Sequence, residues 1–416
     1  MKPLSLLFLF LLHFIISFSQ SQLSEDAYTR YELLDPDTQS FRIIYEVSST
    51  TPGLQFYYNT LRNGSGHTVN SVVDMMTGKD LEWTIVGGIA ARKSGFSEAE
   101  PDGEYLKIKL GRSVPPGCEY RLKIDKTYKD DASYYKKNDI IIFDRSLGIK
   151  RNAVVLPKGY ELVKCNYPSQ IVLEQDGRIK VSFINAGPQD VPFHLEAKKL
   201  PDSVDLTIAK SAFIESNEVG QGRDKSKARI NFDFPERSNQ TREIVYFLEQ
   251  PETHSFRLYH DYTETKEGTD RYINVVRTGS KASNPSAKML DTGKELKVET
   301  IKGGVISDRG LDIGEPVTSE TEIVVIWYDA IKKGQTARLR IEETYTDANR
   351  YILNGNEFIF DRAFGRPFNT VVLPEGWFIT ANAIPATVDI QDGRVSLTYV
   401  NDSPGDIEVY VKGRKK

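Results

Sequence analysis

Apolar side chains recur at every second position in many short segments of this chain. In FRIIYEV (41–47), Phe41, Ile43, Tyr45 and Val47 fall on one parity. The same alternation appears in residues 121–128, 178–184 and 395–400. Because successive side chains of a β-strand point to opposite faces, this period of two predicts half-buried strands. No segment of ten or more residues shows the 3.6-residue period of an amphipathic helix.

Turn signals separate the predicted strands at intervals of about 10–15 residues. The clearest are Asp176-Gly177 and Asp392-Gly393, each flanked by alternating segments. Glycine tolerates the positive φ that a tight hairpin turn requires, so these pairs predict β-hairpins. The spacing predicts about nine or ten short strands in each half of the chain, which indicates an all-β fold of sandwich type.

The sequence contains an internal repeat. Residues 123–145 align without gaps with residues 340–362, and TGKDL (77–81) matches TGKEL (292–296). Further matches, in the same order, are 36–42 with 251–257, 152–160 with 369–377, and 175–185 with 391–401. A repeat of this length indicates a tandem duplication. We therefore expect two homologous β-sandwich units, each built as one large sandwich or as two small ones, with Pro115-Pro116-Gly117 as a candidate internal boundary.

Four segments follow from these matches. We expect a signal peptide at 1–19, a first sandwich repeat at 20–200 (copy 1), a linker at 201–228, and a second repeat at 229–416 (copy 2). The linker contains a polar stretch, residues 215–228, after residues 204–214, which could add a strand to copy 1. Residues 229–234 could open copy 2 with a strand that copy 1 lacks.

The N-terminus has the composition of a secretory signal. A short positive start, Met1-Lys2, precedes an apolar run from Leu4 to Phe18, and small residues at Ser17 and Ser19 offer a cleavage site. No second apolar stretch of about 20 residues follows, so the sequence predicts no transmembrane segment and a secreted or periplasmic protein.

Net charge narrows the choice of partners, and the cysteine content allows at most one disulfide within the chain. The 416 residues carry 54 Lys and Arg against 58 Asp and Glu, a net charge of −4, which gives no reason to expect nucleic acid or an anionic membrane as partner. The two cysteines, Cys118 and Cys165, both lie in copy 1 and could form one disulfide in an oxidising compartment. The alternative is a free buried pair.

The second half of each copy resembles the N-terminal β-domain of M1-family aminopeptidases. The likeness covers about 60 residues per copy and rests on Asn369, the run Val371-Val372-Leu373-Pro374-Glu375-Gly376-Trp377, an acidic hairpin and a closing strand. It implies a β-sandwich. The catalytic domain of that family requires His-Glu-x-x-His, which this sequence does not contain, so the resemblance implies no activity here.

A polar and aromatic set is shared between the copies and is the best candidate for a ligand site. Its members, with one tryptophan, are Asp125, Tyr128, Asp130, Arg145, Glu342, Tyr345, Asp347, Arg362 and Trp377. Carboxylates and guanidinium groups could hydrogen-bond a sugar or peptide, and aromatic rings could stack on it. In the alternative interpretation these residues are structural: the aspartates accept hydrogen bonds from turn amides, and Trp377 is a core residue.

The sequence offers little catalytic or metal-binding chemistry. No histidine is shared between the copies, and His194 and His260 replace tyrosines at strand positions. No His, Cys and carboxylate spacing resembles a zinc site, and we predict no cofactor. Asp130-Asp131 could ligate calcium, but Asp347 is followed by Ala348, so this pair is not repeated.

These observations favour a non-catalytic secreted or periplasmic protein that binds or scaffolds a glycan or a protein of the envelope or of the extracellular space. One alternative is a carbohydrate-active enzyme that uses carboxylates and tyrosines of one copy. Another is a purely structural envelope component. Copies that match in pattern but differ in side chains suggest a pseudo-symmetric pair with one altered site.

Overall fold

The computed structural model describes residues 25–202, 236–277, 279–403 and 405–416. The predicted signal peptide and the strands expected at 204–214 and 229–234 lie outside these residues. The elements of copy 1 are β1 (Ala27–Leu33), η1 (Pro36–Thr38), β2 (Ser40–Ser49), β3 (Phe56–Leu61), β4 (Gly66–Asp74), β5 (Trp83–Gly87), α1 (Gly88–Lys93), β6 (Glu104–Lys109), β7 (Tyr120–Lys129), β8 (Tyr134–Lys137), β9 (Ile140–Leu147), β10 (Arg151–Val155), β11 (Tyr160–Cys165), β12 (Gln170–Leu173), β13 (Ile179–Ile184) and β14 (Val191–Lys199). Those of copy 2 are β15 (Glu243–Leu248), η4 (Pro251–Thr253), β16 (Ser255–Glu264), β17 (Arg271–Val276), β18 (Lys281–Met289), β19 (Lys297–Lys302), α2 (Val305–Asp308), β20 (Glu322–Trp327), β21 (Ala337–Thr346), β22 (Tyr351–Asn354), β23 (Glu357–Phe364), β24 (Phe368–Val372), β25 (Trp377–Asn382), β26 (Thr387–Gln391), β27 (Arg394–Val400) and β28 (Ile407–Lys415).

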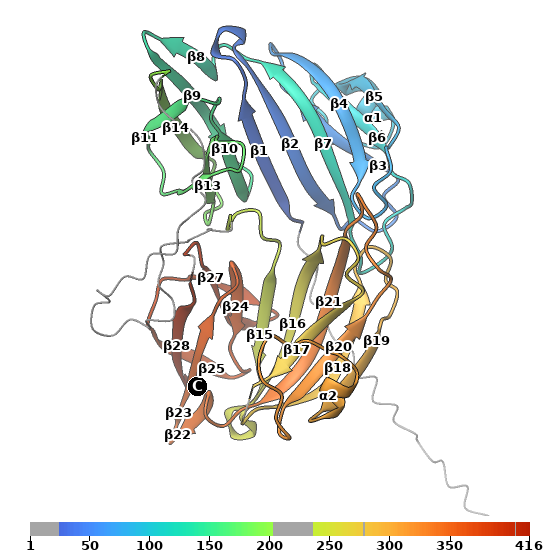
Figure 1. Cartoon of the computed structure of the whole chain (residues 1–416), viewed down its shortest axis with the longest axis vertical. Helices are drawn as coiled ribbons and strands as arrows, with labels where there is room; N and C mark the ends of the chain where they lie inside the picture. The colour runs from blue at the N-terminus through green and yellow to red at the C-terminus, as the bar shows by residue number, and fades with distance from the viewer. Residues whose placement is uncertain (1–24, 203–235, 278, 404) are drawn as a thin grey trace, which may run out of the picture.

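The two copies have the same sheets in the same strand order, which confirms the predicted tandem β-sandwiches (Figure 1). Copy 1 has a seven-stranded sheet, β12-β13-β10-β1-β2-β7-β4, a three-stranded sheet, β3-β6-β5, and a four-stranded sheet, β11-β14-β9-β8. In copy 2 the corresponding sheets are β26-β27-β24-β15-β16-β21-β18, β17-β20-β19 and β22-β23-β28-β25. Each copy thus has fourteen strands among the described residues, more than the nine or ten expected, because several strands are only four to six residues long.

Neither expected arrangement, one large or two small sandwiches, describes a copy fully. The long sheet is shared: one end packs on the four-stranded sheet and the other end on the three-stranded sheet. In copy 1 this creates two apolar clusters, one around Phe41 and Phe143 and one around Leu106 and Tyr120. Pro115-Pro116-Gly117 lies in the loop before β7, a strand of the shared sheet, so it is not a domain boundary.

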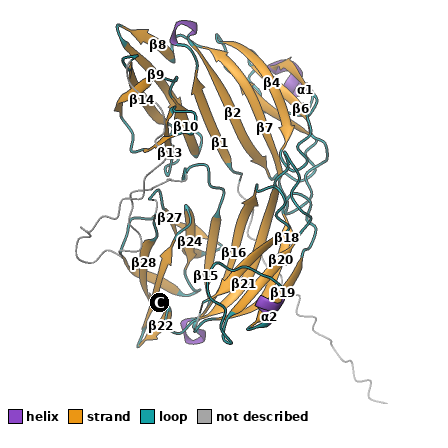
Figure 2. Ribbon diagram, in the orientation of Figure 1, coloured by secondary structure: helices purple, strands orange, loops and turns teal. Residues whose placement is uncertain are grey.

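Helix is confined to short segments, as the missing 3.6-residue period predicts (Figure 2). The six-residue α1 and the four-residue α2 occupy the same position in the two copies, each next to its three-stranded sheet. There they help to bury a small additional cluster, around Ala91 in copy 1 and Ile306 in copy 2. None of the helices in the described part of the chain is long and apolar enough to cross a lipid bilayer.

The copies join through reciprocal backbone contacts. The amide of Glu119 donates to the carbonyl of Leu290, and the amide of Thr336 donates to the carbonyl of Met75, both at 3.0 Å. By the sequence alignment, Glu119 corresponds to Thr336 and Met75 to Leu290. Such exchange of equivalent partners is what a two-fold interface produces. The repeated turns TGKDL and TGKEL lie at this junction, where an added Cβ on Gly78 would come within 2.6 Å of the Gly334 carbonyl oxygen.

The expected disulfide is wrong, because Cys118 and Cys165 are both free. Cys118 is buried in the loop before β7, where it faces the Gly293 turn of copy 2. Cys165 ends β11 and packs against the core beneath the four-stranded sheet, at the other end of copy 1.

Candidate functional site

Most of the shared polar residues serve the scaffold. Asp125 accepts hydrogen bonds from Arg42 Nε at 2.9 Å and from Asn70 Nδ2 at 2.8 Å. Asp130 accepts from the Ser133 hydroxyl at 2.8 Å and lies 3.2 Å from Arg145 Nη1. These contacts are the turn and ion-pair chemistry of the structural interpretation.

The corresponding residues of copy 2 are also largely occupied. Asp347 accepts from Ser280 Oγ at 2.7 Å and from the Asn349 amide at 3.0 Å. Glu342 is half-buried on β21, opposite Tyr259 of β16. Trp377 is 3% exposed in the core, and its indole N–H donates to Gln250.

The nine predicted residues therefore do not form one groove. Tyr128 is buried and stacks on Phe41 in copy 1, away from the residues of copy 2. Of the nine, only Tyr345 and Arg362 come together at a cavity, which lies in copy 2. Among the described residues there is no group of three or more His, Cys, Asp or Glu placed to hold a metal ion.

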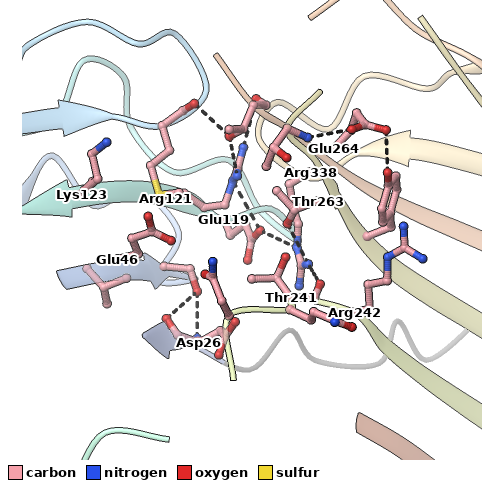
Figure 3. Close-up of a pocket in the computed structure, with 18 of the residues that line it drawn as sticks. Asp26, Glu46, Glu119, Arg121, Lys123, Thr241, Arg242, Thr263, Glu264 and Arg338 are labelled. Atoms are coloured by element: carbon pink, nitrogen blue, oxygen red, sulfur yellow. Dashed lines mark hydrogen bonds and ion pairs between the residues drawn. The ribbon is translucent and has the colours of Figure 1, made fainter. Parts of the chain in front are cut away.

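A larger cleft lies between the two copies and contains none of the predicted residues (Figure 3). Its volume is about 530 Å³, within the range of small-molecule and peptide-end sites. Copy 1 contributes residues before β1 and from β2, β7 and β10, and copy 2 contributes residues 239–242, β16 and β21. Glu46 of β2 and Lys123 of β7 are direct cross-strand partners, on the opposite strand face from the core residues Tyr45 and Ile124.

Most charged side chains around this cleft form ion pairs with one another. Arg121 binds Asp291 of copy 2 through two N–H groups at 2.9 and 2.8 Å. Arg151 makes the same bidentate contact with Asp26, at 3.0 and 2.8 Å. Burial by itself would raise the pKa of Asp26, but Arg151, with Lys150 and Arg338, lowers that pKa to about 2.

Two further carboxylates of the cleft have partners, Glu119 through an ion pair and Glu264 through neutral hydrogen-bond donors. Glu119 reaches across the junction to Arg338, with Nε and Oε1 3.2 Å apart. Its burial raises the pKa of Glu119, against the opposing effect of Arg338. Glu264 accepts hydrogen bonds from the Tyr262 hydroxyl at 2.5 Å and from the amides of Thr265 and Lys266.

Besides Glu264, three charged side chains of the cleft make no ion pair among the described residues. Lys123, Arg242 and Glu46 face the cleft with no ion-pair partner within residues 25–202 and 236–416, as far as these are described. Figure 3 shows Lys123 and Arg242 on opposite sides of the site. Arg242 lies over the Tyr262 ring, 4.3 Å from its centroid. Burial raises the pKa of Glu46, and Arg151 and Lys123 oppose this rise. Among the described residues, the cleft therefore has two cations without an ion pair, Lys123 and Arg242, and two carboxylates without one, Glu46, whose pKa is raised, and Glu264, whose partners are neutral.

Comparison with known proteins adds little. No protein-family model matches the chain, and neither does any curated protein. Among solved structures, an M1 zinc metallopeptidase from Deinococcus radiodurans is similar at 13% identity, with 43% of each chain covered and a TM-score of 0.29. An aminopeptidase N family protein from Idiomarina loihiensis is similar at 11% identity over 41% of this chain and 29% of that one, with a TM-score of 0.26. The matched regions span less than half of either enzyme. The likeness is too slight to assign an activity.

Sequence reasoning missed the cleft because its residues come from both copies and only the tertiary structure brings them together. One signal was present. The turns 77–81 and 292–296 match across the copies, although they are surface turns whose sequence a sandwich core does not dictate. Such a match indicates a shared contact, and both turns lie at the junction that forms the cleft.

Proposed function

We propose that this protein is an exported, non-catalytic binding protein that holds an acidic segment of a partner protein in the cleft between its copies. The observation that carries the proposal is the pair of cations, Lys123 and Arg242, that lie on two sides of a polar cleft and make no ion pair among the described residues. Positive potential in a partly desolvated cleft attracts carboxylates and speeds their association. The N-terminal apolar run at residues 4–18 supports export.

The lining favours a peptide over a neutral glycan. Sugar rings bind well where an aromatic face is open to them. Among the described residues, Tyr262 is the one aromatic residue that lines the cleft, and the guanidinium of Arg242 already covers its face. The serine, threonine, asparagine and glutamine side chains of the lining can hydrogen-bond a peptide backbone.

The lining also favours binding over glycoside cleavage. That reaction requires two carboxylic groups free to act on the substrate. Of the carboxylates in the cleft, Asp26, Glu119 and Glu264 are engaged by Arg151, Arg338 and Tyr262, which leaves Glu46.

The test is a binding assay on the mature protein. Fluorescently labelled ten-residue peptides that are acidic, neutral or basic are titrated by anisotropy, beside a panel of neutral and uronic-acid oligosaccharides assayed for binding and for new reducing ends. We expect the acidic peptides to bind best, with affinity that falls as salt is raised. Lys123→Ala and Arg242→Ala should each weaken them about five- to tenfold, on the order of 1 kcal/mol.

Lys164→Ala is the matched control, because Lys164 is an exposed cation paired with Glu196 on the four-stranded sheet, away from the cleft. Equal binding of acidic and basic peptides, or an equal loss in the control, would overturn the proposal. So would oligosaccharide turnover, or oligosaccharide binding without peptide binding.

A further inference from the structure

A second cavity lies inside copy 2, where its three sheets meet. Its volume is about 260 Å³, and its walls come from β16, β21 and β24 of the long sheet, β17 of the three-stranded sheet and β23 of the four-stranded sheet. Its polar lining includes His260, Asn274, Glu343, Tyr345, Arg362 and Asn369. Two of these, Tyr345 and Arg362, belong to the candidate set predicted from sequence.

Four buried polar atoms at this cavity have no hydrogen-bond partner in the part of the chain that is described. They are His260 Nε2, Glu343 Oε1, Arg362 Nη1 and Asn369 Oδ1. All four residues are less than 9% exposed. Each such group costs on the order of 1–3 kcal/mol when it is left without a partner. Four of them around one cavity indicate that something polar belongs in it.

Their orientation is fixed by their other contacts. Asn369 donates through Nδ2 to the carbonyl of Arg366 at 2.8 Å, so its oxygen is the atom left as an acceptor. Glu343 Oε2 accepts from Asn274 Nδ2 at 2.8 Å, which leaves Oε1 without a partner. The same Asn274 amide donates to the Tyr345 hydroxyl at 2.8 Å. The cavity therefore offers acceptors on one part of its wall and a guanidinium on another.

The guanidinium of Arg362 is the strongest signal. No carboxylate of a described residue lies within ion-pair distance of it, and its Cζ lies 5.2–5.9 Å from the ring centroids of Tyr246, Phe256 and Tyr345. A buried charge without a counter-ion is costly. Arg277 and Arg366 also line the cavity, against Glu343 and Asp406. This excess of positive charge suits an anion.

Copy 1 shares only part of this unpaired set among the described residues: Asn152 Oδ1, the equivalent of Asn369 Oδ1, also has no partner, but the positions of Arg362 and Glu343 differ. Arg145, which corresponds to Arg362, is ion-paired with Asp130. Lys126 stands where copy 2 has Glu343, and its ammonium donates to Asn59 at 2.5 Å. The unpaired Arg362 guanidinium and Glu343 Oε1 are therefore properties of copy 2.

We infer that this cavity binds one small organic carboxylate that also carries hydrogen-bond donors, either hydroxyl or ammonium groups. The carboxylate pairs with Arg362, and the donors satisfy Glu343 Oε1 and Asn369 Oδ1. A volume near 260 Å³ limits the ligand to about the size of a single hydroxy acid, amino acid or uronic acid. This inference does not depend on the function proposed for the cleft between the copies.

Calorimetric titration of the full mature protein tests it. Glucuronate, lactate and serine are compared with glucose and acetate, which lack the carboxylate and the donors respectively. Binding of at least one of the first three, tenfold or more above glucose and acetate, is expected. Hydroxy acids and amino acids are separate arms, so the preferred donor is read directly.

Variants then locate the site. Arg362→Lys and Glu343→Gln should each weaken binding about tenfold, whereas Arg145→Lys, the equivalent change in copy 1, and Lys123→Ala in the cleft should leave it unchanged. If Arg362→Lys fails to fold, Glu343→Gln and the ligand series still decide. Absence of binding by all three carboxylates at millimolar concentration, or equal binding of glucose and glucuronate, would overturn the inference and leave a cavity filled by water.

Discussion

The two copies differ most at positions where two opposite charges form an ion pair in one copy (a closed pair) and do not in the other (an open pair). Glu46 and Lys123 of copy 1 correspond to Asp261 and Arg340 of copy 2, and both pairs sit directly opposite each other on neighbouring strands. In copy 2 the pair is bidentate, at 2.8 and 2.7 Å, with Arg340 over the ring of Tyr259. In copy 1, Glu46 and Lys123 face the cleft without an ion pair.

At a second set of equivalent positions, in the sandwich cores, the ion pair is formed in copy 1 and not in copy 2. Arg145 of copy 1 is closed on Asp130, whereas its equivalent in copy 2, Arg362, faces a cavity without an ion pair. Each copy thus has one closed and one open arrangement at equivalent positions. Duplication kept the backbone register, and exchanges of a few side chains decided which positions are available to a ligand.

The largest expected effect concerns the two buried arginines that cross the junction. Asp291→Ala should lower the free energy of unfolding by about 3–5 kcal/mol, because it leaves Arg121 buried without its bidentate partner. Glu119→Ala should cost less, since its contact with Arg338 is single, whereas Asp291 binds Arg121 through two N–H groups. Urea unfolding measures both. Asp329→Ala, an exposed aspartate, is the control. Equal costs for Asp291 and Glu119 would contradict the ranking.

The repeated turns provide a second comparison. Gly78 and Gly293 correspond to each other and have φ of +69° and +74°. An alanine Cβ at Gly78 would lie 2.6 Å from a backbone oxygen, but at Gly293 it would lie 3.0 Å from the Cys118 sulfur, which can shift. We expect Gly78→Ala to cost about 2–3 kcal/mol and Gly293→Ala about 1–2 kcal/mol.

Gly64→Ala is the control for these two turns. Its φ is +81°, and nothing lies within 4 Å of the added Cβ, so it should show only the backbone strain of about 1 kcal/mol. Thermal and urea unfolding of the three variants give the ranking. A Gly78 variant no less stable than the Gly64 variant would show that the turns do not press against the other copy.

A pH titration examines the ion pair of Asp26 and Arg151, which lines the same cleft as Glu46 and Lys123. The pKa of Asp26 is about 2 in the folded protein, below its ordinary value of 3.8, so the unfolded chain binds the proton more readily. The resulting stability is present above about pH 4 and is lost as the pH falls through 2. It amounts to about 2 kcal/mol.

Asp26→Asn removes this contribution, so the stability difference between wild type and variant should shrink between pH 5 and pH 2. Asp202→Asn, at an exposed position, should show no such change. Acid unfolding followed by circular dichroism measures the difference. A gap that stays constant with pH would mean that Arg151 does not hold the Asp26 carboxylate.

The smallest expected effect on stability comes from copying the closed pair into the open position. Glu46→Asp combined with Lys123→Arg should add about 0.5–1 kcal/mol in a double-mutant cycle. Ile44 stands where copy 2 has Tyr259, so the ring under the guanidinium is not reproduced. The same double variant should lose most of its affinity for acidic peptides. Unchanged affinity would show that the cleft cations do not take part in binding the peptide.

How much of this could be predicted from the sequence differs between fold and site. The period of two around Phe41 predicted the strand β2, and the gapless match of 123–145 with 340–362 predicted two copies of one architecture. The strand count was too low, because four-residue strands such as β8 and β22 are too short to show a period. Of the nine predicted site residues, Tyr345 and Arg362 lie at a cavity, and aspartates such as Asp130 instead serve turns and ion pairs.

Local alternation of apolar and polar residues, written twice, was enough to determine that this chain forms paired sheets in two similar halves. That information is local, since each strand carries its own buried face. Only the tertiary structure decided which charged side chains form ion pairs and which face a cleft or cavity without one. Lys123 and Arg242 are separated by more than a hundred residues, and they share a cleft only because the two copies pack through reciprocal contacts at Glu119 and Thr336.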